Sequence, residues 1–89
     1  MRADPFVTAT LPSEITRAIR AVLGLPDLDL DAGTLLEELP GWDSMLHIAI
    51  MVELECRFGI EVAPREVEAV VSVDDLVRMV GAKQVLNAS

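Results

Sequence analysis

The chain has 89 residues, which is enough for one domain near the small end of those that fold alone. Its formal net charge is −8, so binding to phosphate backbones is disfavoured. Its one cysteine cannot form a disulfide within the chain, so stability must come from an apolar core, which the 52% hydrophobic content can supply. It shows no secretory signal and no membrane-spanning apolar run, so we expect a cytoplasmic monomer that binds neither membranes nor nucleic acid.

The two ends of the chain are predicted to lie outside the folded domain. Residues 1–10 show no clear hydrophobic period, so we expect a flexible N-terminal tail there. The folded domain is expected to span residues 11–86, and residues 87–89 are expected to form a C-terminal tail.

The first helix is predicted to begin at Leu11. From that residue the apolar positions recur at helical spacing, and Pro12 suits a first turn. Gly24 and Pro26 then end the helix.

Residues 24–43 are predicted to form a long connection rich in acids and breakers. A short helical turn is predicted within it over 34–39, with Thr34 as the cap and Glu37 three residues later. Five leucines could pin this loop to the helices: Leu28, Leu30, Leu35, Leu36 and Leu39.

The second helix is predicted to run from Ser44 to Phe58 and to stop at Gly59. It is apolar nearly all round, and a small domain cannot bury such a helix on every side, so one stripe should face a partner. The stripe predicted to face the core is Ile50, Leu54 and Phe58. The stripe predicted to face outward is Met45, Ile48 and Val52.

Two further helices complete the predicted fold. Pro64 opens a short third helix through about Ala69, and Ser72 caps a last helix with Asp75 three positions later, while Gly81 weakens or ends it. The fold class is therefore all-α, with four helices, a long first loop and a short third helix. The expected core includes Val22, Leu23, Ile50, Leu54, Phe58, Leu76 and Val80.

Ser44 follows Trp42-Asp43 where the breaker-rich loop gives way to the second helix. A serine at a helix start, with an exposed hydroxyl and an acid before it, suits covalent attachment. The stretch from Leu35 to Val80 resembles the acyl carrier protein family, whose signature is Asp-Ser-Leu at the start of the second helix; here the motif is Asp-Ser-Met. The resemblance implies a carrier-type bundle, in a discrete carrier without catalytic activity of its own.

The same resemblance implies a cofactor and partners. Ser44 would bear 4′-phosphopantetheine, attached from coenzyme A by a phosphopantetheinyl transferase, and the thiol of this arm would hold acyl groups as thioesters for acyl-loading and acyl-processing enzymes. Asp43 is the companion acid, and it also suits the helix dipole. The residues expected to meet partners are Trp42, Met45, Ile48, Val52, Glu53 and Glu55. Trp42 could instead anchor the loop, and Ile48 could be ordinary core.

The second helix departs from the strongly acidic one of well-studied fatty-acid carriers. Leu46, His47 and Ala49 occupy much of its first two turns. A polyketide, fatty-acid-like or mixed natural-product pathway therefore fits better than primary fatty-acid synthesis. A peptidyl or aminoacyl carrier is the alternative, although such carriers usually show Gly-Gly-His-Ser or Gly-Gly-Asp-Ser.

Three functions outside the carrier family match parts of the sequence. Asp27, Asp29, Asp31, Gly33 and Glu38 partly match a calcium loop, but the sixth position is not glycine. A serine hydrolase would need an orienting group and an oxyanion site beyond Ser44 and His47, and the only histidine is better placed on the surface of the second helix. An unmodified helical interaction module also remains open.

Overall fold

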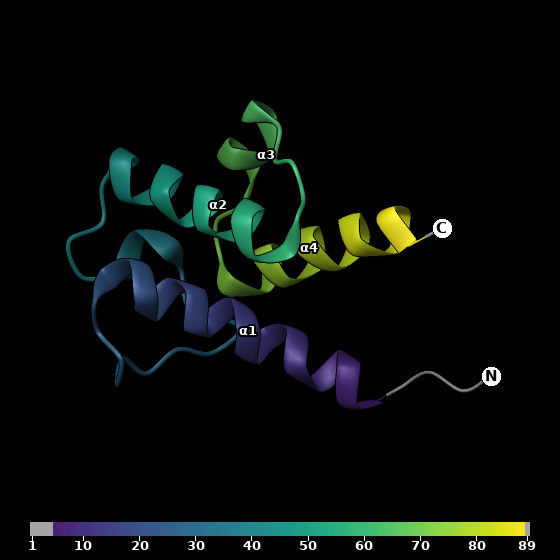
Figure 1. Ribbon diagram of the computed structural model, residues 1–89. Coiled ribbons are helices and arrows are strands. Elements are labelled where there is room, and N and C mark those ends of the chain that lie inside the picture. Colours follow the sequence, from purple (N-terminus) through teal and green to yellow (C-terminus); the bar gives the residue numbers. More distant parts are fainter. Residues whose placement is uncertain (1–4, 89) are drawn as a thin grey trace.

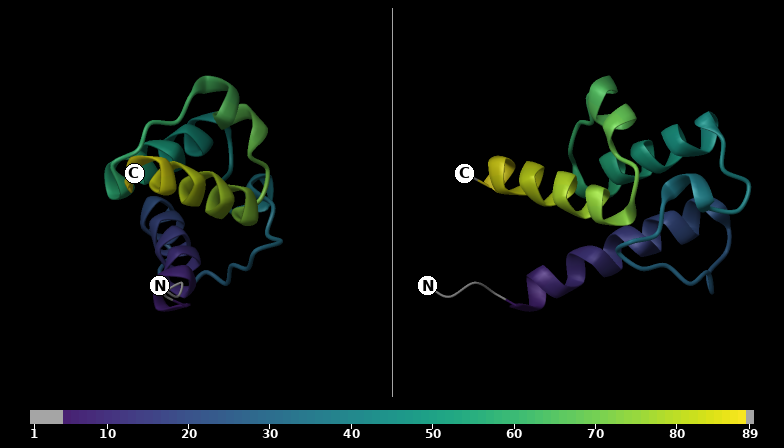
Figure 2. Two further views of the ribbon diagram at one scale, coloured as in Figure 1. Left: turned by 90° about the vertical axis from the view of Figure 1, so that its right-hand side faces the viewer. Right: turned by 180° about the vertical axis from the view of Figure 1, so that it is seen from behind.

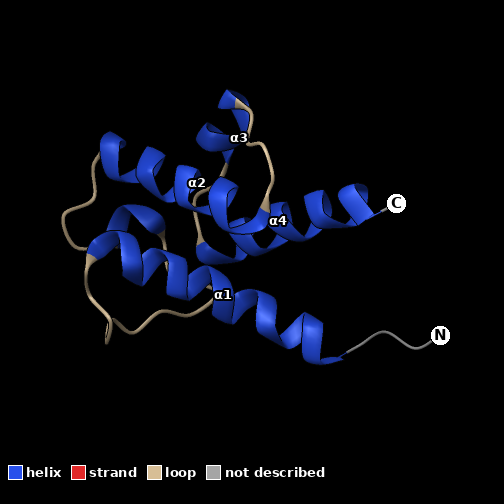
Figure 3. Ribbon diagram, viewed as in Figure 1, coloured by secondary structure: helices blue, strands red, loops and turns tan. Residues whose placement is uncertain are grey.

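The protein is described here by a computed structural model covering residues 5–88, with side chains for residues 11–85. The elements in chain order are α1 (Pro5–Leu23), the 3-10 helix η1 (Leu36–Glu38), α2 (Ser44–Phe58), α3 (Pro64–Ala69) and α4 (Val73–Ala88) (Figures 1 and 3). The predicted all-α, four-helix fold with a long first loop and a short third helix is confirmed.

The long helices pack as a bundle, and α3 lies on its outside. α1 contacts both α2 and α4, whereas α3 packs against α2 (Figure 2). The start of α2 and the η1 turn lie close together, at the end of the bundle away from the C-terminus of α4 (Figure 1). This end of the bundle therefore holds the loop-to-helix junction at Ser44.

The core is aliphatic and is drawn from one face of each long helix. Ile50, Leu54, Leu76 and Val80 are fully buried, as predicted. Among the side chains of α1 from Leu11 onward, Ile15, Ala18 and Ile19 are buried.

Three residues predicted for the core, Val22, Leu23 and Phe58, are only half-buried against its edge. They lie in the last turns of α1 and α2, where a helix has fewer neighbours to cover it.

The outer ends of the first and last helices differ from the prediction. α1 begins at Pro5, so helix occupies part of the stretch predicted to be a tail, and residues 1–4 lie outside the described residues. Pro12 is therefore inside the helix, where it lacks the N–H that would bond to the carbonyl of the preceding turn. α4 likewise continues past Gly81 to Ala88. A β-carbon at Gly81 would lie 3.4 Å from Leu11 Cδ2, an ordinary van der Waals contact, so α1 passes beside this part of α4.

The long first loop is tied to the helices at several points. Leu36 and Leu39 are buried in the core, and Arg20 Nε donates to the Leu28 carbonyl at 2.7 Å. Three backbone hydrogen bonds join the loop to the start of α4: Leu36 N to Val71 O at 2.9 Å, Val73 N to Thr34 O at 3.0 Å and Asp74 N to Ala32 O at 2.9 Å.

The short turn in this loop is capped differently from the prediction. Its N-cap is Leu35, not Thr34. The Thr34 hydroxyl instead accepts a hydrogen bond from the Asp31 backbone N–H at 3.0 Å, which closes the preceding turn.

Within the described residues, no helix combines the length and the apolar character needed to cross a membrane.

Candidate functional site

Ser44 is the first residue of α2, and its side chain is exposed. Gly41 turns the chain with φ of 72°, a left-handed conformation that favours glycine. Asp43 is extended, with φ of −155°, and its Oδ1 accepts from the Leu46 backbone N–H at 2.8 Å. This N-cap fixes the helix start directly beside the serine hydroxyl.

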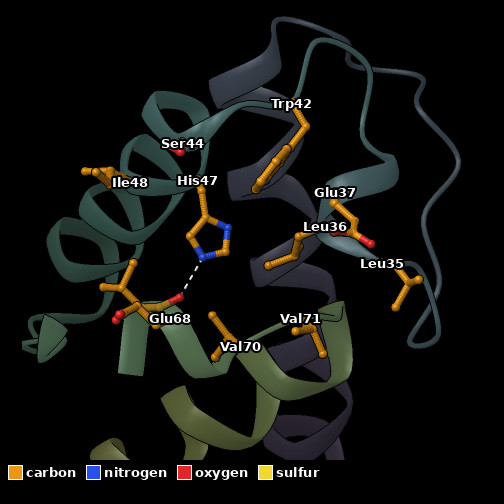
Figure 4. Close-up of a pocket in the computed structure, with 11 residues that line it drawn as sticks. Leu35, Leu36, Glu37, Trp42, Ser44, His47, Ile48, Glu68, Val70 and Val71 are labelled. Carbon is orange, nitrogen blue, oxygen red and sulfur yellow. Dashed lines mark hydrogen bonds between the residues drawn. The ribbon is translucent and has the colours of Figure 1, made fainter. Parts of the chain in front are cut away.

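A groove of about 460 Å³ opens beside Ser44, between α2, η1, α3 and the α3–α4 link (Figure 4). Its lining is mostly aliphatic, including Leu36, Ile48, Val70 and Val71. Glu37 and Glu68, both exposed, also border it. The exposed Ser44 hydroxyl therefore lies at the margin of this mostly apolar groove, which extends toward α3.

His47 reaches into this groove from the first turn of α2 (Figure 4). Its Nε2 lies 2.7 Å from the Val67 carbonyl oxygen of α3, the bond drawn as a dashed line. Its Nδ1 is buried and has no hydrogen-bond partner, and the Trp42 ring packs edge-on at a centroid distance of 6.0 Å. The placement of this histidine on the surface was therefore wrong: the side chain is half-buried between α2 and α3.

The same geometry gives Ser44 no base of its own. The Nε2 of His47 is committed to Val67, and no hydrogen bond joins its Nδ1 to the serine. A hydrolase needs the base within hydrogen-bond reach of the nucleophile, so the arrangement does not support one.

The outward stripe predicted on α2 is exposed. Met45 is 74% exposed, while Ile48 and Val52 are each 49% exposed. Ile48 is therefore not core, and it lines the groove as well as the surface. Trp42, at 36% exposed, both anchors the loop against His47 and presents part of its ring to solvent.

The two acids expected to meet partners have bonds within the chain. Glu53 Oε2 lies 2.6 Å from Arg57 Nε, one turn later on α2. Glu55 Oε2 accepts from the Val62 backbone N–H at 2.9 Å and so holds the segment that follows α2. The α2 surface near Ser44 is thus more apolar than its count of acids suggests.

The α3–α4 link forms the far wall of the groove and is fixed by a capping box. Ser72 Oγ accepts from the Asp75 N–H at 3.2 Å, and Asp75 Oδ2 accepts in return from Ser72 N at 3.3 Å, as predicted. The same carboxylate accepts from Val71 N at 2.9 Å. These bonds, that of Val71 foremost, hold the pKa of Asp75 below its usual value.

α3 carries a second carboxyl group with a lowered pKa. Lys83 Nζ of α4 lies 2.8 Å from Glu66 Oε1, and this hydrogen bond is the main cause that lowers the pKa of Glu66. The Ala63 backbone N–H donates to the same oxygen at 2.8 Å and adds to the effect.

The acidic loop does not assemble a metal site in the described part of the chain. There, no three His, Cys, Asp or Glu side chains converge closely enough to hold an ion. Asp31 Oδ1 instead accepts from the Gly33 N–H at 2.9 Å and from the Thr34 hydroxyl at 3.2 Å, as in an ordinary turn. The geometry gives the calcium reading no support.

Sequence reasoning missed the link from His47 to α3, although one signal for it was present. Residues three apart on a helix share a face, so His47 had to lie on the same side of α2 as Ser44. What the sequence did not show is that α3, twenty residues later in the chain, lies opposite that face.

Comparison with known proteins agrees with this geometry. A family described as the phosphopantetheine attachment site matches residues 13–80. The solution structure of a holo acyl carrier protein from Geobacter metallireducens has a TM-score of 0.80 and 25% sequence identity, over 89% of this chain and 91% of that chain. Among curated proteins there is no match. The chain therefore belongs to the phosphopantetheine-binding carrier family, whose members bear the arm and leave catalysis to other proteins.

Proposed function

We propose that Ser44 is the attachment residue, and that the protein carries acyl groups for enzymes of a polyketide, fatty-acid-like or mixed natural-product pathway. The observation that carries the proposal is the position of Ser44, exposed on the first residue of α2 and at the margin of the groove. Asp43 supports it by fixing the helix start one residue earlier.

Attachment requires one bond to form and one to break. The Ser44 oxygen attacks the phosphorus of coenzyme A that bears pantetheine, the pyrophosphate bond breaks, and adenosine 3′,5′-bisphosphate leaves with the bonding electrons. A serine hydroxyl needs a base to take its proton. Neither Asp43, whose Oδ1 is bound to Leu46 N, nor His47 is bonded to Ser44, so the transferase supplies that base.

The residues beside Ser44 fit a phosphopantetheine arm. The arm has two methyl groups near its serine end and amides and a hydroxyl along its length, so it needs apolar walls with a few polar partners. The groove offers aliphatic walls and the buried, unpartnered Nδ1 of His47. When bound, the arm supplies a thiol that holds the acyl group as a thioester.

Met45, Ile48 and Val52 form the surface that we assign to partner enzymes. All three are exposed along one side of α2, next to the attachment residue. The net charge of −8 favours encounter with basic partner surfaces, while the apolar stripe supplies the contact area. The transferase and the acyl-transferring enzymes are expected to share this surface.

The pathway assignment rests on the weak acidity of α2. Glu53 and Glu55 are both bonded within the chain, so partners meet mainly apolar side chains near Ser44. Dedicated enzymes that read an apolar stripe fit this better than primary fatty-acid enzymes that read acids. Malonyl transfer by a fatty-acid malonyltransferase to the holo form, as fast as to its own carrier, contradicts this assignment.

The attachment residue can be tested by intact mass. Wild type, Ser44→Ala and Ser13→Ala are incubated with coenzyme A, Mg²⁺ and a broad-specificity phosphopantetheinyl transferase. Ser13 is a matched control because it is an exposed serine on α1. We expect a gain of one phosphopantetheine in wild type and Ser13→Ala only. A gain in a folded Ser44→Ala variant contradicts the assignment.

A further inference from the structure

We propose that His47 is the positioning residue for the arm, and that its Nδ1 accepts a hydrogen bond from a hydroxyl or amide N–H of phosphopantetheine. This inference rests on the proposed function, because it takes Ser44 as the point of attachment. It adds a role for a side chain that the attachment chemistry does not use.

The contact with α3 decides which ring nitrogen carries the proton. A backbone carbonyl oxygen can only accept, so the 2.7 Å contact with Val67 requires His47 Nε2 to donate. In a neutral imidazole with its proton on Nε2, the other ring nitrogen carries no proton. The neutral ring therefore presents a lone pair at Nδ1.

That lone pair is buried and unused. Nearly all buried polar atoms in folded proteins have a hydrogen-bond partner, and an exception calls for an explanation. In Figure 4 this nitrogen points toward the side of the groove where Leu36 and Trp42 lie. The walls near it are mostly apolar, so the described chain supplies no donor for this nitrogen, and a group that enters the groove is the candidate.

The occupant that the structure offers is the arm itself. Ser44 and His47 line the same groove, three residues apart on one face of α2. An arm that starts at Ser44 and turns into the groove passes His47 with its serine end, the part that holds the hydroxyl and the first amide. Its two methyl groups match the apolar surface of Trp42 and Leu36.

The charges around the groove favour the same path of the arm, from Ser44 into the groove. Glu37 and Glu68 are acids at its border, and they repel the phosphodiester from its interior. The phosphate is therefore held at the mouth, beside the helix start at Ser44, while the uncharged part of the arm enters. Both acids are exposed to solvent. A hydroxyl or amide of the arm that loses its water on entering the groove therefore has His47 Nδ1 as its buried acceptor.

The test is NMR on isotope-labelled protein, in which His47 is the only histidine. Imidazole nitrogen shifts are compared between the unloaded and fully loaded wild type, with loading checked by intact mass. We expect the Nδ1 signal to move to the hydrogen-bonded range on loading, with nuclear Overhauser contacts between the methyl groups of the arm and Trp42. An unchanged Nδ1 signal in fully loaded protein overturns the inference, while failure to load at all counts against the proposed function instead.

A matched variant separates positioning from structure. His47→Gln keeps a donor near the position of Nε2 for the Val67 carbonyl but has no acceptor at the position of Nδ1. We expect it to fold and load, and to lose the contacts between the arm and Trp42. If a folded, loaded His47→Gln retains those contacts at wild-type strength, the histidine does not position the arm. Loading with a pantetheine that lacks the hydroxyl then identifies the donor: loss of the Nδ1 shift names the hydroxyl, and its persistence names the amide.

Discussion

Asp43 caps α2, and we propose that the transferase also recognises its charge; two substitutions can separate these roles. Its Oδ1 accepts from Leu46 N at 2.8 Å, and it is the acid next to Ser44. Asp43→Ala removes both the cap and the charge. Asp43→Asn keeps a side-chain oxygen that can cap the helix and removes only the charge.

The Asp43 cap sets the expected loss of stability in each variant. Losing an N-cap to alanine costs about 0.5–2 kcal/mol, and 1 kcal/mol shifts the melting temperature of a domain this small by roughly 4–8 °C. Asp43→Ala should therefore melt several degrees lower than wild type. The melting temperature of Asp43→Asn should stay closer to that of wild type, because this variant loses only the interaction of an exposed charge with the α2 dipole, about 0.3–1 kcal/mol.

The rate of loading by the transferase measures the second role. If the transferase pairs a basic group with Asp43, both variants should load more slowly than wild type by a factor of about two to five, the worth of one exposed ion pair. Thermal unfolding followed by circular dichroism and initial loading rates from intact mass provide the two measurements. An Asp43→Ala variant that melts like wild type refutes the capping argument, and an Asp43→Asn variant that loads at the wild-type rate refutes the recognition argument.

Three further predictions concern the core, the partner surface and pH. Leu54→Ala empties a fully buried position and should cost about 2–5 kcal/mol in denaturant unfolding; a loss below 1 kcal/mol contradicts its place in the core. Met45→Glu and Val52→Glu change exposed residues, so each should slow acyl transfer by partner enzymes while shifting stability by about 0.5 kcal/mol or less; severe unfolding would place them in the core. The fold lowers the pKa of Asp75 below 3.8, chiefly through the Val71 N–H, so its stabilisation is present above pH 3.8 and is lost as the pH falls through the folded-state pKa. Asp75→Asn should therefore flatten the acid side of the stability profile, and an unchanged slope below pH 4 contradicts this.

Element boundaries were predictable where local chemistry sets them. Both bounds of α2, Ser44 and Phe58, were predicted. In the structure the Asp43 cap sets the first and Gly59, whose φ of 63° suits glycine, sets the second. The start of α3 at Pro64 and the capping box of Ser72 with Asp75 were predicted for the same reason, since each depends on residues within one turn.

Predictions from the sequence were wrong or incomplete where contacts between distant parts of the chain determine the structure. Glycine often ends a helix, yet α4 continues past Gly81 to Ala88, packed against α1. The start of α1 at Pro5 was missed because the residues before Leu11 show no hydrophobic period. The attachment residue could be proposed from its motif alone, but the groove and the unpartnered nitrogen of His47 exist only because α3 folds back onto α2.

The two sides of the groove differ in how firmly they are held, and this bears on what the groove can hold. On one side, Leu36 is part of the core and its N–H bonds to Val71. On the other, α3 is six residues long and has no buried residue: Val67 packs half-buried against the core, His47 contacts the Val67 carbonyl, and Lys83 pairs with Glu66. So short a helix opens more readily than the core. The groove thus has one wall inside the core and one wall outside it, and we expect a bulkier occupant to displace α3 before it disturbs the packing that keeps the domain folded.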